Sequence, residues 1–264
     1  MAFWGTWERS AIVLAVVLAG CVPAQQRLPP ISADRPSVTD GVTTIPRGTA
    51  QLESGYTATC GGGEPCDHSV GEALLRLGLW SRTEARIALN SYEVEPQDGS
   101  TQRGFDDASL DFKIRLYVAP DSQIQLTPST SLFVGTSVPT GNGDFGARHP
   151  APMAKLAVDW FLGRRFDLAA NAIIGAQLDD QGRYTQSGAS VSLSKDFAEH
   201  LGGYFEWYAL GGNAHSALSS HSLNAGLSFT IRRDFQVDAR YGGAITGSDR
   251  NWFFGVGFAR RWPR

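Results

Sequence analysis

Residues 108–118 read ASLDFKIRLYV, and along this stretch apolar side chains alternate with polar or charged ones. Leu, Phe, Ile, Leu and Val fill the even positions from 110 to 118, while Asp, Lys, Arg and Tyr fill the odd positions between them. Successive side chains of a strand point to opposite faces, so the stretch predicts a strand with one apolar and one charged face. A strand of a two-sheet sandwich would alternate in the same way, so the fold depends on the number of such strands and on their connections.

The same alternation recurs to the end of the chain and predicts twelve strands. They fall near residues 49–59, 70–79, 84–94, 108–118, 123–134, 153–162, 166–177, 184–194, 199–210, 221–231, 235–242 and 252–262. Short connections at 80–83, 119–122, 163–165, 195–198 and 232–234 alternate with longer ones near 60–69, 95–107, 135–152, 178–183, 211–220 and 243–251. The sequence therefore predicts an all-β fold, a transmembrane antiparallel β-barrel of about twelve strands with short periplasmic turns and longer outer loops.

The charged face of these strands requires a polar environment. A sealed sandwich core would not hold this many ionisable side chains, and Arg or Lys facing lipid near the midplane would cost about 2–4 kcal/mol each. We expect the following residues to face a polar lumen: Glu53, Glu84, Arg86, Asp111, Lys113, Arg115, Lys155, Asp159, Glu206, Asp238 and Arg240. The opposite face, which carries residues such as Leu156, Leu227 and Phe254, is expected to face lipid.

The start of the chain predicts export. Residues 11–20, AIVLAVVLAG, are a long apolar run, yet they are too few to span a bilayer, which needs about 20 residues. We therefore expect residues 1–20 to be a signal peptide. Residues 18–21, LAGC, resemble the lipobox of bacterial lipoproteins, in which Cys21 would be acylated, and ordinary cleavage after Ala24 is the alternative. Residues 21–48 hold several prolines and no sustained period, which predicts an extended periplasmic leader or plug before a barrel over residues 49–264.

Two cysteines lie close together in a glycine-rich loop. Cys60 and Cys66 flank the sequence GGGEP, and in an oxidising compartment such a pair predicts a disulfide. A metal site that also uses His68 is the alternative, but a second ligand pair is missing. The remaining histidines are scattered along the chain, so we expect no metal site and no other cofactor.

Several short motifs, taken in their order along the chain, resemble a known family. They are DRP at 34–36, IPRG at 45–48, QLESGY at 51–56, LRLGL at 75–79, PTG at 139–141 and HSLNAGL at 221–227. Over residues 32–260 the chain resembles the transporter-like outer-membrane family named for the meta-pathway of phenol degradation. The resemblance implies an outer-membrane barrel that passes small hydrophobic or aromatic compounds. One departure is the chain end, RRWPR, since barrel proteins commonly end in an aromatic residue.

The expected function is that of an outer-membrane channel or transporter for small solutes. Its partners would be outer-membrane lipid and a small-molecule solute, and the sequence does not indicate an oligomeric state. With 23 Lys and Arg against 26 Asp and Glu, the chain lacks the basic excess of nucleic-acid-binding proteins, so no nucleic-acid partner is expected. A non-conducting structural or surface-binding barrel remains the alternative.

An outer-membrane lipid hydrolase is the enzymatic alternative. Such enzymes use a Ser with a His and an acidic or amide partner. His221 and Ser222 are adjacent on a predicted strand and would point to opposite faces, and the Gly-x-Ser-x-Gly pattern is absent. We therefore expect no catalytic residues and no enzymatic activity.

Overall fold

The computed structural model describes residues 28–61, 65–97, 99–120, 124–125, 127–147, 149–179, 182–211, 220–246 and 251–263. The expected signal peptide, Cys21 and the alternative cleavage site at Ala24 lie outside these described residues.

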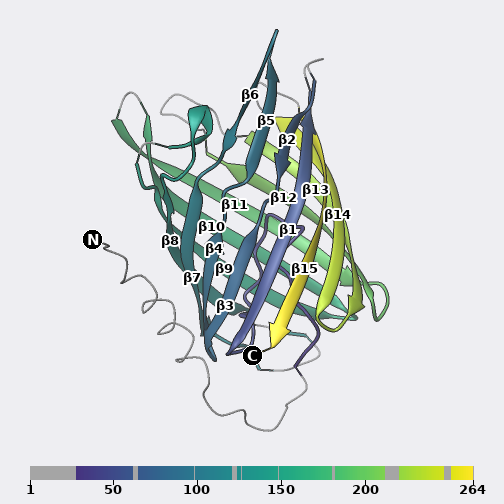
Figure 1. Ribbon diagram of the computed structural model, residues 1–264. Helices are drawn as coiled ribbons and strands as arrows, with labels where there is room; N and C mark the ends of the chain where they lie inside the picture. The colour runs from purple at the N-terminus through teal and green to yellow at the C-terminus, as the bar shows by residue number, and fades with distance from the viewer. Residues whose placement is uncertain are drawn as a thin grey trace, which may run out of the picture.

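Within the described part of the chain, twelve strands form a closed antiparallel barrel (Figure 1). They are β1 (Thr49–Cys60), β3 (Leu74–Trp80), β4 (Thr83–Ala88), β7 (Ala108–Tyr117), β8 (Ser129–Val138), β9 (Pro152–Gly163), β10 (Phe166–Asp179), β11 (Gly182–Asp196), β12 (Leu201–Leu210), β13 (Ser220–Arg232), β14 (Phe235–Thr246) and β15 (Trp252–Pro263). Each strand pairs with the next in this order, and β15 pairs with β1 to close the ring. The predicted twelve-stranded barrel is thus confirmed.

Three further strands extend the sheet beyond the rim at the end opposite the C-terminus, as Figure 1 shows: β2 (Asp67–Val70), β5 (Tyr92–Gln97) and β6 (Ser100–Phe105). The predicted strand at 70–79 is divided because β2 pairs with the outer half of β1 and β3 with its first half, with Gly71 at a positive φ of 98° between them. The predicted loop at 95–107 was wrong, since β5 and β6 form a hairpin there. Gly99, at a φ of 76°, provides the left-handed backbone that such a tight turn needs.

The eighth strand of the chain begins later than its alternation predicted. The expected strand at 123–134 runs instead over Ser129–Val138, so the connection after β7 is longer than the predicted 119–122 turn. Gln125 explains the difference, because its backbone N–H donates to the carbonyl of Phe161 at 2.8 Å, while the N–H of Phe161 donates to the Gln125 side chain at 3.1 Å. Gln125 therefore contacts the end of β9 instead of joining the ladder.

The strands place their apolar side chains outside the ring. On β7, Phe112 is 40% exposed whereas the adjacent Lys113 is 0% exposed. The exposed large apolar residues include Leu110, Leu116, Val134, Leu156, Ile174, Val191, Leu193, Phe205, Leu227, Phe229, Ile231, Phe254 and Val256. An apolar exterior that alternates with a polar interior is what a membrane-spanning barrel requires.

At the end of the barrel that holds the C-terminus, most connections are short. The turn between β9 and β10 consists of Arg164 and Arg165, both at positive φ, which suits the twist of a tight hairpin. The opposite end carries the longer loops, one of which contains the 3-10 turn η1 (Gly143–Phe145). Among the described residues, no helix has the length and apolar character needed to cross a membrane.

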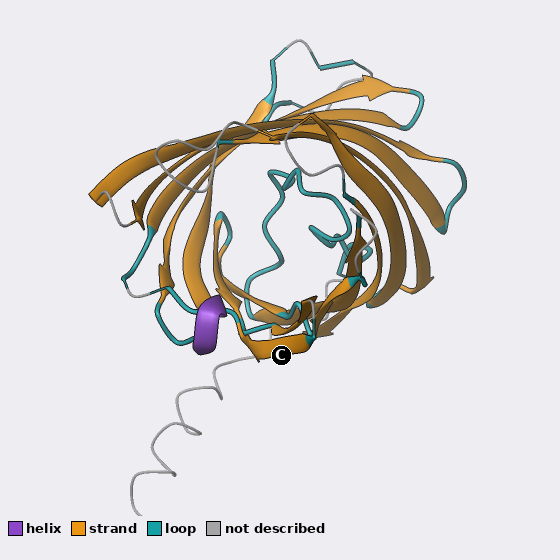
Figure 2. Cartoon of the chain, turned by 90° about the horizontal axis from the view of Figure 1, so that it is seen from above, coloured by secondary structure: helices purple, strands orange, loops and turns teal. Residues whose placement is uncertain are grey.

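Residues 28–48, called the inner segment below, run through the interior of the barrel. Figure 2 shows chain in loop conformation inside the ring of strands. The side chain of Gln51 on β1 donates to the carbonyl of Ser32 at 2.9 Å, and Asn171 on β10 bonds the backbone of Asp40. Since β1 and β10 lie on opposite sides of the closed ring, a segment that contacts both must lie inside it.

Candidate functional site

Two buried glutamates on well-separated strands of the barrel bind the backbone of the inner segment. Glu53 on β1 accepts the N–H groups of Asp34 and Arg35, each at 3.0 Å. Glu206 on β12 accepts the N–H groups of Val38 and Thr39 at 2.8 and 2.9 Å. Both glutamates are 0% exposed. The inner segment has no strand or helix partner for these donors, so the carboxylates replace the hydrogen bonds that a sheet would supply.

Three more wall residues continue this pattern along the inner segment. Glu84 on β4 accepts the N–H of Ile45 at 2.7 Å, and Asp159 on β9 accepts the N–H of Val42 at 3.0 Å. Asn171 accepts the N–H of Asp40 at 2.8 Å and donates to its carbonyl at 3.0 Å. The inner segment is therefore held by side chains from many strands, which fixes its path without making it part of the sheet.

Asp34 is the centre of a cationic cluster. Its carboxylate lies 3.3 Å from Arg76 on β3 and 3.2 Å from the ammonium of Lys113 on β7, and it also binds the guanidinium of Arg86 on β4. Burial by itself raises the pKa of this carboxyl, but the attraction of the three cations is stronger in sum and holds the pKa well below its usual range. Asp34 is therefore a charged anchor of the inner segment.

Asp40 forms a second anchor beside the first. It pairs with Lys155 on β9, and its other oxygen lies 3.2 Å from Arg86. Burial again raises the pKa of the carboxyl, and the charges of Lys155 and Arg86 outweigh it, so the pKa of Asp40 is lowered from its ordinary value. Arg86 joins the two anchors, since it contacts Asp34 and Asp40 together.

Arg35 attaches the inner segment to the seam where the barrel closes. Its guanidinium pairs with Glu72 at 2.7 Å and lies 3.7 Å from Asp238 on β14. It occupies space that two glycines of β1 and β15 leave open: an added Cβ on Gly55 would stand 2.2 Å from Nη2, and one on Gly257 would stand 2.5 Å from Nε. These two positions therefore require glycine while Arg35 is docked.

Most of the residues expected to face the lumen lie in this network. Contacts with the inner segment are made by Glu53, Glu84, Arg86, Lys113, Lys155, Asp159, Glu206, Asp238 and Arg240. Asp111 joins indirectly, because its carboxylate lies 3.1 Å from Nε of Arg86. Arg115, two residues after Lys113 on β7, is half-buried.

Sequence reasoning missed several members of the network. Arg76 is 1% exposed and contacts Glu53 and Glu84 at 2.9 Å each. It could have been found, because it alternates with Leu75 and Leu77 on its strand. Asp34, Arg35, Asp40 and Glu72 lie outside the barrel strands, so no alternation marks their direction.

The two cysteines of the glycine-rich loop form a disulfide. Cys60 at the end of β1 is bonded to Cys66, just before β2. His68 is engaged elsewhere, since its Nδ1 lies 2.7 Å from the hydroxyl of Tyr56. Among the described residues, no group of three His, Cys, Asp or Glu side chains is arranged to hold a metal ion.

The adjacent His221 and Ser222 do not form a catalytic pair. Ser222 on β13 is buried. The imidazole of the adjacent His221 lies beside the ring of Trp207, with 5.6 Å between the ring centroids. Successive strand residues face opposite sides, so the hydroxyl and the imidazole are directed apart. The pair His215 and Ser216 lies outside the described residues.

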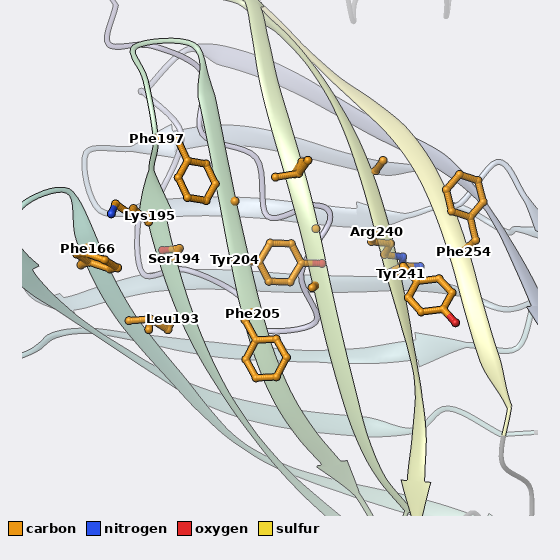
Figure 3. Close-up of a pocket in the computed structure, with 15 residues that line it drawn as sticks. Phe166, Leu193, Ser194, Lys195, Phe197, Tyr204, Phe205, Arg240, Tyr241 and Phe254 are labelled. Atoms are coloured by element: carbon orange, nitrogen blue, oxygen red, sulfur yellow. The ribbon is translucent and has the colours of Figure 1, made fainter.

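A groove of about 510 Å³ lies on the outer face of the barrel, over β10 to β15. Figure 3 shows aromatic residues along it, among them Phe197, Phe205 and Tyr241, all of which are exposed on the exterior. Gly226 forms part of its floor, where an added Cβ would stand 2.5 Å from the ring of Tyr204. It opens on the apolar exterior, and two of the residues that line it, Tyr204 and Arg240, also donate to the carbonyl of Pro36 in the inner segment.

Residues 33–262 match the family described as "Putative MetA-pathway of phenol degradation". The COG4313 outer membrane channel from Pseudomonas putida F1 is similar in structure, with a TM-score of 0.62 and 12% identity over 83% of this chain and 97% of that one. No curated protein matches the chain in sequence.

Two porins are also similar in structure. The KdgM porin in complex with disordered oligogalacturonate has a TM-score of 0.52 and 11% identity over 80% of this chain and 98% of that chain. The NanC porin has a TM-score of 0.53 and 9% identity over 79% and 98%. At these low sequence identities, the similarity shows a shared barrel fold alone.

Proposed function

Because the chain belongs to the family of the MetA-pathway of phenol degradation, we propose that it is an outer-membrane channel for small organic solutes and that the inner segment is its plug. The short motifs in the sequence resemble this same family, and that resemblance implies that the solutes are small hydrophobic or aromatic compounds. The outer-membrane location is supported by the closed barrel with its apolar exterior.

The interior of this barrel is filled by the inner segment, which supports the proposed role as a plug. Small barrels fill their interior with the side chains of their own strands, while large ones leave an open pore. In this barrel the charged wall is covered by residues 28–48, which join the ring covalently only at Thr49 and are otherwise held by hydrogen bonds and ion pairs. A segment held in this way can leave without unfolding the wall, and its departure would open a polar path.

The wall indicates weak ion selectivity. Asp111, Asp159, Glu206 and Asp238 lie among Arg86, Lys113, Lys155 and Arg240, so both signs of charge line the interior. Selective pores instead show rings of one sign. The mixed lining favours organic solutes over inorganic ions as the transported class.

The test is conductance across a planar bilayer, with the purified mature protein and a Glu206→Ala variant. Removal of Glu206 takes away three hydrogen bonds to Val38 and Thr39, so we expect openings to become more frequent and longer. Glu199→Ala, in the exposed turn before β12, is the matched control and should behave as wild type. If neither the wild type nor Glu206→Ala conducts, and liposomes containing them do not swell in small organic solutes, a non-conducting structural or surface-binding barrel is the better assignment.

A further inference from the structure

Three side chains form a row across the interior wall. Lys113 on β7, Phe133 on β8 and Lys155 on β9 are direct cross-strand partners. The ring of Phe133 is 2% exposed, and the two ammonium nitrogens stand 5.0 and 5.2 Å from its centroid. Cross-strand neighbours of an antiparallel ladder point to the same face, so the ring and both cations point to the inner segment together. We call Lys113, Phe133 and Lys155 the cationic row.

The inner segment presents a matching set of groups to this row. Asp34 places its carboxylate 3.2 Å from the ammonium of Lys113, and Asp40 pairs with Lys155. On the same segment, the buried side chain of Val42 forms an apolar cluster with Phe133 and Ala157. The segment therefore offers two carboxylates and one apolar body to two ammonium groups and one aromatic ring.

Two neighbouring carboxylates of the wall are paired with arginines, and a third, that of Asp159, accepts the N–H of Val42 at 3.0 Å. Glu84 binds Arg76 through both oxygens, at 2.9 and 3.0 Å, and Asp111 lies 3.1 Å from Nε of Arg86. In the described part of the chain, the ion pairs of Lys113 and Lys155 are both with the inner segment. When that segment leaves, the two ammonium groups face the opened path without the carboxylates that paired with them, and another anion can take that place.

We propose that the cationic row is the binding site for a small organic carboxylate with an aromatic or other flat apolar body, and that Asp34, Asp40 and Val42 occupy it as an internal mimic of that solute. The proposal rests on the channel function proposed above and names its substrate class. The solute carboxylate takes the place of Asp34 or Asp40 at an ammonium group, and its apolar body takes the place of Val42 against Phe133. Since solute and inner segment cannot occupy the row together, the solute shifts the segment towards its displaced position.

The first experiment measures binding and opening with benzoate as the probe. Benzyl alcohol has nearly the same shape without the charge, and acetate has the charge without the ring. We expect benzoate to bind the detergent-solubilised protein in calorimetry and to lengthen the open time in planar bilayers, while benzyl alcohol and acetate are each weaker by about tenfold, the loss expected for one charge-assisted contact or one buried ring.

Two variants test whether benzoate binding depends on the cationic row. Lys113→Gln should weaken benzoate binding by about tenfold or more, and Phe133→Leu should reduce the preference for benzoate over acetate while leaving acetate binding unchanged. Lys195→Gln is the matched control, because Lys195 lies on the outer groove with its ammonium 4.4 Å from the centroid of Phe166. The heat-dependent shift of the barrel band on gels verifies that each variant is folded.

The outcomes separate the two proposals. If the wild type conducts but benzoate and benzyl alcohol act alike, or Lys113→Gln binds benzoate as tightly as wild type, the carboxylate site is wrong and the channel function stands. If calorimetry shows benzoate binding that depends on Lys113 while no bilayer or liposome shows transport, the site is supported and the channel function fails.

Discussion

At the residue scale, Arg76 is buried against three carboxylates, those of Asp34, Glu53 and Glu84. We expect Arg76→Met to destabilise the protein by about 3–5 kcal/mol, because it takes the ion-pair partner from the buried Glu53 and one of the cations from Asp34 and from Glu84. The measurement is the denaturant midpoint of the folded barrel in detergent, followed by the gel shift between folded and unfolded bands.

The matched control for this substitution is an ion pair at the surface. Arg260 lies 3.0 Å from Asp234, with side chains that are 31% and 36% exposed. A solvent-exposed pair contributes little, so Arg260→Met should change stability by no more than about 1 kcal/mol. Equal midpoints for the two variants would contradict the anchoring role of Arg76.

Residues on the strands could be assigned a side from the sequence, and residues off the strands could not. Lys113 and Glu206 were expected inside because alternation fixes the direction of each side chain. Asp34 and Asp40 lie in a stretch with no period, and their partners on β4, β7 and β9 are distant in sequence. Their role follows only once the ring has closed around them.

At the element scale, cysteine labelling along β7 tests which of its side chains face lipid and which face the interior. Single cysteines at Phe112, Lys113 and Arg115 should react differently with a charged, water-soluble thiol reagent. Phe112→Cys faces lipid and should stay unlabelled, and Arg115→Cys, at a half-buried position, should react fastest. Lys113→Cys faces inward but is covered by the inner segment, so it should react slowly. Similar rates at Phe112 and Arg115 would contradict the orientation of the strand.

Alternation predicted the strands better than it predicted where they begin, end and break. The fold class, the strand number and the order of the ladder followed from period-2 patterns and connection lengths. The divisions of two predicted strands, at Gly71 and between Ala88 and Tyr92, did not, because side-chain alternation says little about where a strand changes partners. The late start of β8 depends on the contact of Gln125 with Phe161, which lies outside any local pattern.

At the scale of the whole molecule, the barrel and the inner segment are two parts with different bonding. The wall is held by continuous backbone ladders from β1 around to β15. The inner segment is held by side chains, and its charged anchors Asp34 and Asp40 lie on one side of the ring while Glu206 binds it from another. We expect this difference in bonding to let the inner segment move while the wall keeps its shape.

A reversible cross-link between the two parts tests this directly. The hydroxyls of Thr39 on the inner segment and Ser190 on β11 are 3.0 Å apart, which is close enough for a disulfide after a small shift if both are replaced by cysteine. In a background with Cys60→Ser and Cys66→Ser, oxidised Thr39→Cys/Ser190→Cys should lose conductance and benzoate-induced opening, because the segment is tied to the wall. Dithiothreitol should restore both, and the single variant Thr39→Cys should respond to neither treatment. If the oxidised protein conducts as well as the reduced one, displacement of residues 28–48 is not what opens the barrel.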